Sequence, residues 1–235
     1  MRVVAPLLLV LMASPAAADP ATAVYNHACA WCHGKAGRGD GPAAFSINKY
    51  RAPRPRDFTR GQFKLRSTPS GQLPTDDDLL RTLERGIPGY MPSFHGLTDG
   101  ERRLAVVAVK RFFPGFATTP PAPSFASRIP PPADDAAVAR GRELYAAAGC
   151  AACHGERGRG VGPSAATLRD ADGLPIRAAD LRYPARFKGG AEPVDLYRTL
   201  MSGLDGTPMP SYATALGDDP RAPWDLVAYV RSLRR

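Results

Sequence analysis

Two stretches of this sequence decide its fold: CAWCHGKAGRGDGPAA, residues 29–44, and CAACHGERGRGVGPSAA, residues 150–166. Both begin with two cysteines and a histidine in the order Cys-x-x-Cys-His, and both reach Gly-Pro at the same distance beyond that histidine. The first copy maps onto the second at a constant offset of 121 residues. Repetition at a fixed offset indicates a duplicated structural unit. We therefore expect two homologous domains in one chain.

The repeat extends well beyond the cysteines. DLLRTLERGIPGYMPSF, residues 78–94, corresponds to DLYRTLMSGLDGTPMPSY, residues 195–212. Between the copies, residues 117–133 contain six prolines in seventeen residues, and proline-rich runs are extended and fairly stiff. We expect a linker there, with a strap lying across both domains as the alternative. The expected domains are residues 19–116 and residues 134–235.

The spacing of apolar residues predicts helices in both units. Each unit has a short amphipathic helix before the cysteines, a helix carrying Arg-Thr-Leu, and a closing helix. In the first unit Thr98 is the expected cap of the closing helix, with Glu101 three residues further on. No alternating strand pattern of useful length occurs, so the expected fold class is all-α.

The first residues predict export. MRVVAPLLLVLMASPAAADP, residues 1–20, has one basic residue, a short apolar run and small residues before Asp19, which is typical of a secretory signal peptide. We expect the signal peptide to be residues 1–18. The apolar run is too short to cross a bilayer, and no later stretch comes near its length. The sequence therefore predicts a periplasmic protein without a membrane anchor of its own.

All four cysteines lie in the two Cys-x-x-Cys-His units. An oxidising compartment would usually turn four cysteines into two disulfides, but this pentapeptide marks covalent attachment of a c-type haem. Two thiols one helical turn apart hold the ring, and the next residue is an imidazole that can reach the iron. A zinc site, a redox dithiol or a disulfide pair would leave the shared histidine unexplained. The sequence predicts two haem c groups, attached through Cys29, Cys32, Cys150 and Cys153, with His33 and His154 as iron ligands.

The second iron ligand of each haem has few candidates. The second unit has no further histidine, so Met209 is the expected ligand, and Met201 is the poorer choice because it lies within a helical pattern. Met91 has the matching Met-Pro context in the first unit, where His95, four residues later, is the competitor. His27 precedes the first cysteine and is expected to lie on the surface.

Other side chains are candidates for haem packing and for binding of the haem propionates. Arg81 and Arg198 occupy the same place in the repeated Arg-Thr-Leu, where each either anchors propionates or lies on a solvated helix face. The apolar residues expected around the rings are Phe63, Leu83, Phe187 and Leu200.

The sequence resembles the class I cytochromes c, as a tandem dihaem form. CAWCH with Met91 about sixty residues downstream and a closing helix carries the resemblance, and CAACH with Met209 repeats it. The resemblance implies that the first and last helices of each domain cross, at Gly141 and Tyr145 in the second domain and at Ala21 and Tyr25 in the first.

The resemblance also implies a backbone carbonyl that orients each haem-binding histidine. The Gly-Pro pairs that end in Pro42 and Pro163 are the places where we expect this acceptor.

Ligation by histidine and methionine fills both axial positions and suits the transfer of single electrons. We therefore expect an electron carrier. Dihaem peroxidases also have two c-type haems but need a displaceable ligand, which His95 in place of Met91 would indicate. Dihaem thiosulfate dehydrogenases use a cysteine as iron ligand, and no cysteine is left over here. An electron-transfer subunit of a larger oxidoreductase would differ from a carrier only in its partner.

The net charge of +9 is unevenly distributed. KYRAPRPRDFTRGQFKLR, residues 49–66, holds seven basic residues and one acidic residue. Such a stretch could steer an acidic redox partner, since complementary charge accelerates encounter. Pairing with propionates, or a solvated loop, is the alternative. Its interleaved aromatic residues superficially match a nucleic-acid surface, but a secreted haem protein does not fit a nucleic-acid partner. Peripheral contact with a membrane redox complex stays open.

Overall fold

The computed structural model describes residues 19–47, 53–120, 122–125 and 130–234. The expected signal peptide lies outside these residues, as do Tyr50 and Arg51 of the basic stretch. Throughout the described residues the chain forms helices and loops, with two isolated β-bridges, Ile87 with Met91 and Arg169 with Pro175, and no strand. The all-α prediction is confirmed. No helix in this described part of the chain is long and apolar enough to cross a membrane.

The first unit is built on two helices that pack against each other, α1 (Pro20–Ala28) and α5 (Asp99–Arg111). The predicted cap of α5 is present, because Thr98 and Glu101 form a reciprocal capping box. Helix α4, which carries Arg-Thr-Leu, packs against α5. The remaining elements of this unit are α2 (Ala30–His33), α3 (Pro42–Ile47), a 3₁₀ turn at Phe58–Arg60, α4 (Asp76–Arg85) and α6 (Gly115–Thr118).

The second unit repeats this arrangement. Helices α7 (Asp135–Ala147) and α11 (Ala222–Ser232) cross, and α9, the counterpart of α4, packs against α11. Helix α11 carries the centre of the core, where Leu226 and Val227 are almost fully buried. The other elements are α8 (Ala151–His154), 3₁₀ turns at Ala165–Thr167 and Pro184–Arg186, α9 (Pro193–Ser202) and α10 (Ala213–Leu216).

The helix crossing of the second unit depends on a glycine. A Cβ atom on Gly141 would lie 2.8 Å from the Cβ of Tyr229 and even closer to the backbone of Asp225, so a side chain has no room there. In the first unit Ala21 occupies the corresponding place and is 1% exposed. The crossing at Gly141 and Tyr145 is therefore where the sequence predicted it.

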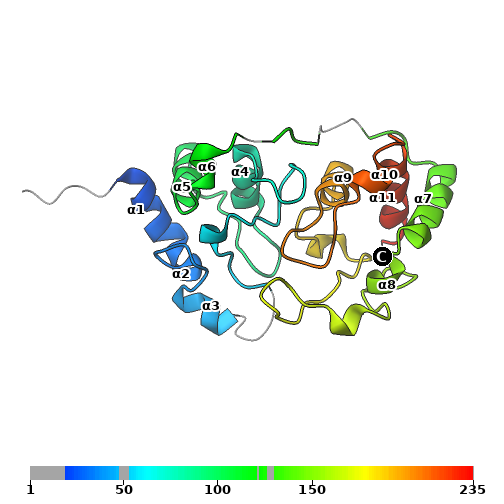
Figure 1. Cartoon of the computed structure of the whole chain (residues 1–235), viewed down its shortest axis with the longest axis horizontal. Coiled ribbons are helices and arrows are strands. Elements are labelled where there is room, and N and C mark those ends of the chain that lie inside the picture. The colour runs from blue at the N-terminus through cyan, green and yellow to red at the C-terminus, as the bar shows by residue number, and fades with distance from the viewer. Residues whose placement is uncertain (1–18, 48–52, 121, 126–129, 235) are drawn as a thin grey trace, which may run out of the picture.

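The two units lie side by side, and the described parts of the proline-rich stretch lie along one edge of the molecule between α6 and α7 (Figure 1). This stretch touches both units at Phe125. The amide of Phe125 donates to the carbonyl of Ser67 at 2.7 Å, and its side chain packs against the core of the second unit. At this point the stretch is the strap that the sequence left as an alternative to a plain linker.

Part of the described basic stretch is directed toward the second unit, while Arg54 and Arg60 are exposed. Arg66 is 2% exposed and hydrogen-bonds to the second unit, Arg60 forms an ion pair with Asp172 of that unit, and Lys64 lines a pocket between the units. This path could not be predicted from the sequence, because the contacted residues lie more than a hundred positions away along the chain.

Candidate functional site

Each pair of cysteines lies on a short helix that ends at the histidine. Helices α2 and α8 have the same internal geometry, with the amides of His33 and His154 donating to the carbonyls of Cys29 and Cys150 at 2.9 Å in both. All four cysteines are free thiols rather than disulfides. Burial raises the pKa of Cys29 to about 11, so this thiol is protonated at neutral pH. Each half therefore has a pair of thiols followed directly by an imidazole.

Both histidines are oriented by a backbone carbonyl. Nδ1 of His33 lies 3.0 Å from the carbonyl oxygen of Arg56, and Nδ1 of His154 lies 2.9 Å from that of Ala179. A ring that donates from Nδ1 keeps the lone pair on Nε2, which is the tautomer that an iron ligand requires. Burial lowers the pKa of both histidines, which favours the neutral ring.

The expectation that the Gly-Pro pairs ending in Pro42 and Pro163 supply these acceptors was wrong. The amides of Gly41 and Gly162 instead donate back to the carbonyls of Cys32 and Cys153, at 3.2 and 3.1 Å. A Cβ on Gly41 would lie 2.5 Å from a carbonyl oxygen of α2, so the pair lets the loop pack directly against the cysteine helix. The true acceptors were missed because a backbone carbonyl leaves no mark in residue type.

In the first unit Met91 points into the core and His95 does not. Met91 packs against a buried cluster that includes Leu83 and Val106, and its backbone is fixed by two hydrogen bonds with Ile87, of 2.8 and 2.9 Å. His95 is exposed, with Nδ1 lying 2.9 Å from the hydroxyl of Ser93. The position of Met91 therefore suits a ligand that enters a buried site, and that of His95 suits a surface residue.

The loop of the second unit holds Met209 in the same way. The amide of Leu204 donates to the carbonyl of Met209 at 3.1 Å, and the amide of Met209 donates to the hydroxyl of Thr207 at 3.2 Å. Met209 packs against the second core, whereas Met201 lies inside α9 and is 6% exposed. Elsewhere, His27 is exposed, and the predicted apolar residues Phe63, Leu83, Phe187 and Leu200 are all buried.

Comparison with known proteins identifies the two units. Residues 16–108 match the family of cytochrome c oxidase, cbb3-type, subunit III, and residues 138–234 match the cytochrome c family. Among solved structures, a chain of the Kuenenia stuttgartiensis reducing HAO-like protein complex is 40% identical with a TM-score of 0.86, covering 92% of this chain and 96% of its own. The chain belongs to the cytochrome c family, as a tandem dihaem cytochrome. No curated protein matches it.

The residues of this cytochrome c fit its two haem c groups. The donor set suits the cofactor in both halves: two unpaired thiols at the attachment spacing, and a neutral imidazole whose Nδ1 is already engaged. The thiols would form the covalent attachment, and the imidazoles would bind the irons through Nε2.

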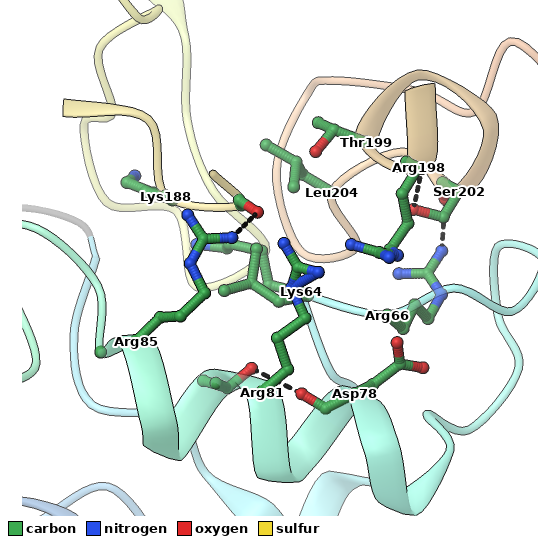
Figure 2. Close-up of a pocket in the computed structure, with 14 residues that line it drawn as sticks. Lys64, Arg66, Asp78, Arg81, Arg85, Lys188, Arg198, Thr199, Ser202 and Leu204 are labelled. Carbon is green, nitrogen blue, oxygen red and sulfur yellow. Dashed lines mark hydrogen bonds between the residues drawn. The ribbon is translucent and has the colours of Figure 1, made fainter. Parts of the chain in front are cut away.

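The two arginines of the repeated Arg-Thr-Leu meet at the boundary between the halves of the cytochrome. Arg81 pairs with the carboxylate of Asp195, Arg198 lies 3.4 Å from it, and Arg85 pairs with it at 2.8 Å. Asp195 is buried, and its single carboxylate interacts with all three guanidinium groups. These arginines thus face each other across a pocket between the halves, and neither Arg81 nor Arg198 lies on a fully solvated helix face (Figure 2).

This interdomain pocket has more positive charge than its own carboxylates can balance. Among the acidic side chains, Asp195 already interacts with three arginines. Asp78 accepts hydrogen bonds from the Ser67 hydroxyl and amide. Burial lowers the pKa of Lys64 to about 7 and also lowers the pKa of Lys188, because a buried site disfavours the charged ammonium. The cationic residues that line it are Lys64, Arg66, Arg81, Arg85, Lys188 and Arg198.

Proposed function

We propose that this dihaem cytochrome c relays single electrons between redox proteins in the periplasm. The observation that carries the proposal is the matched ligand geometry of the two halves. In each half a backbone carbonyl holds the histidine, and a methionine on a distant loop packs against the core. With His33 and Met91 on one iron and His154 and Met209 on the other, neither iron keeps a position for substrate.

The bound haem supplies a reversible one-electron iron couple. In the relay the donor protein loses one electron and the acceptor gains it, and no atom or proton is transferred. The residues of the chain therefore hold the cofactor, orient its histidine ligands and shield it from water. The thiols fix the cofactor, the carbonyls of Arg56 and Ala179 fix the histidines, and buried side chains such as Phe63 and Phe187 exclude water.

Within this proposal, Arg81 and Arg198 bind haem propionates, together with the lysines of the interdomain pocket. Arginine binds carboxylates through a planar fork, and the pocket has a surplus of buried positive charge. Both haems would then approach the same boundary between the halves. Such an arrangement would join the two irons in one relay rather than in two independent carriers. The domains would be residues 19–116 and 134–235, joined by residues 117–133, with residues 1–18 removed on export.

The redox partner in this proposal has an acidic docking surface. The basic stretch is largely used inside the molecule, so we assign docking to the surface around the first cysteine helix. Trp31 lies between the two cysteines and is 67% exposed, and Lys35 and Arg38 on the following loop are exposed. An aromatic residue flanked by cations beside a haem attachment suits an acidic protein.

A second candidate function is a permanent electron-transfer subunit. The structural neighbour is part of a reducing HAO-like protein complex, which favours this candidate and leaves an enzymatic role of such an assembly open. The native mass of the protein distinguishes the two. A carrier is isolated by itself, whereas a subunit is isolated bound to its partner.

The test of ligation is the weak red absorption band that methionine gives on ferric haem, measured in Met91→Ala, Met209→Ala and His95→Ala. Each methionine variant should lose about half of the band, and His95→Ala should keep all of it. The unmodified protein should not consume added peroxide. Loss of the band in His95→Ala, or rapid peroxide consumption by the unmodified protein, would refute the relay and indicate an enzyme.

A further inference from the structure

Asp205 lies on the loop of the second domain that carries Met209, yet its carboxylate is bound by the first domain. It accepts from the guanidinium of Arg66 at 2.6 Å, from the hydroxyl of Ser70 at 2.7 Å and from the amide of Gly71 at 2.8 Å. All three donors belong to the first domain. The loop of Met209 is therefore held from outside its own domain.

Arg66 is suited to this contact because its side chain is completely buried and fully engaged. Its guanidinium donates to the carbonyl of Ser202 at 2.6 Å as well as to Asp205, and to the carbonyls of Phe63 and Pro69 in its own domain at 3.0 and 3.2 Å. A buried charge with this many partners has one well-defined position. It fixes both the last residue of α9 and the loop that follows.

Hydrogen bonds connect Leu204, the residue before Asp205, to Met209. The amide of Leu204 donates to the carbonyl of Met209 at 3.1 Å. The carbonyl of Leu204 accepts from the hydroxyl of Thr207 at 2.7 Å. That hydroxyl in turn accepts from the amide of Met209. The loop is a closed unit, so fixing Asp205 fixes the backbone of Met209.

The same segment of the first domain also contacts the proximal histidine of that domain. The carbonyl of Arg56 accepts from His33, while the Arg56 guanidinium lies beside Gly206 of the Met209 loop, where a Cβ would approach it to 3.2 Å. Residues 56–71 thus reach an axial ligand in one domain and the loop of an axial ligand in the other.

The reverse contact, from the second domain to the loop of Met91, is more exposed. It includes Lys188 over the ring of Tyr90, 5.0 Å from the centroid, and Arg85, which donates to the carbonyl of Gly189 at 3.2 Å and to the carboxylate of Asp195 at 2.8 Å. The Arg85 side chain is 41% exposed, in contrast to the completely buried Arg66. The interface therefore holds the Met209 loop through a buried arginine and the Met91 loop through more exposed side chains.

We propose that Arg66 and Asp205 form an interdomain latch that positions Met209, so that the ligation and potential of the second haem depend on docking of the first domain. The inference rests on the proposed function only in taking Met209 as an iron ligand. Arg66 and Asp205 are positioning residues, since they act through the loop and touch no cofactor.

The test uses the full-length protein with both haems attached and the variants Asp205→Asn and Arg66→Gln. Each variant should lower the red band by up to the share of one methionine. Each should shift the potential of one haem and leave the potential of the other haem unchanged. Each should also speed hydrogen exchange at the amide of Leu204. The matched control is Asp172→Asn, which removes the exposed pair with Arg60 across the same interface. It should leave all three readouts as they are.

Two outcomes would overturn the latch. One is a full band, unshifted potentials and unchanged exchange at Leu204 in both latch variants. The other is an equal effect of Asp172→Asn, which would mean that general loosening of the interface, rather than this contact, is responsible. Failure of the proposed function is distinguishable, because Met209→Ala would then leave the band intact while exchange at Leu204 still reports on the latch.

Discussion

The hydroxyl groups of Tyr25 and Tyr145 show how single residues set up the haem sites. Each donates at 2.7 Å to the carbonyl of the glycine that follows the haem-binding histidine, Gly34 or Gly155. Burial raises the pKa of both tyrosines, so the hydroxyls stay protonated donors. Each bond ties the first helix of a domain to the end of the cysteine helix.

Replacing Tyr25 tests this tie. Tyr25→Phe keeps the ring and leaves the buried carbonyl of Gly34 without its donor, so we expect a loss of about 1 kcal/mol in the free energy of unfolding of the first domain. Chemical unfolding followed by absorbance would measure it. The exposed Tyr183→Phe is the control and should leave stability unchanged. Equal stability of the Tyr25 variant and the wild type would contradict the role of this bond.

At the scale of residues, the sequence allowed prediction of those features that depend on a particular side-chain chemistry. Two thiols and an imidazole at fixed spacing indicate haem c regardless of fold, and Met209 followed from the lack of any spare histidine in the second unit. The carbonyls of Arg56 and Ala179 escaped prediction because every residue has a carbonyl and only the path of the chain selects one. The sharing of Asp195 by three arginines escaped for the same reason, since those groups come from both domains.

At the scale of elements, the crossing of α7 and α11 is closer than a side chain at Gly141 permits. The corresponding crossing of α1 and α5 has Ala21, whose methyl group is accommodated. The two domains therefore differ in how closely the same pair of helices approaches. This difference is a property of one position in each domain.

Gly141→Ala should therefore destabilise the second domain. The added methyl overlaps the backbone at Asp225 and must push α7 and α11 apart, and overpacking of this kind costs about 1–3 kcal/mol. Thermal unfolding would measure the loss. Gly100→Ala, in α5, is the matched control because nothing lies within 4 Å of its added Cβ, and it should be neutral or slightly stabilising. A fully stable Gly141 variant would show that the helices can separate without cost.

The order of helices was predictable because each amphipathic helix shows its spacing within a dozen residues. The path of residues 56–71 was not, since this segment packs on residues far away in the chain. Its charges suggested a partner outside the molecule. The structure places that complementary charge inside, at Asp172 and Asp205.

At the scale of the whole molecule, polar contacts hold the two domains together. The ion pairs of Arg66 and Arg85 with the second domain do not depend on an intact linker. An interface that rests mainly on such contacts is weak unless its parts are kept close.

Cutting the chain within residues 117–124 tests this balance. A protease site inserted there and cleaved should leave the halves bound at high protein concentration and let them separate on dilution, as measured by size-exclusion chromatography. With Arg66→Ala the separation should occur at higher concentration, because a buried ion pair has been lost. Halves that stay together at every dilution would reveal a much stronger interface than these contacts predict.

The strap at Phe125 has a kinetic consequence. A short tether keeps two binding surfaces at an effective concentration on the order of millimolar, however dilute the protein is. The strap shortens the tether further, since Phe125 is pinned to Ser67. In the proposed relay, exchange of an electron between the halves would therefore be a first-order event with a rate independent of protein concentration. Only the encounters at either end of that relay would depend on how much partner is present.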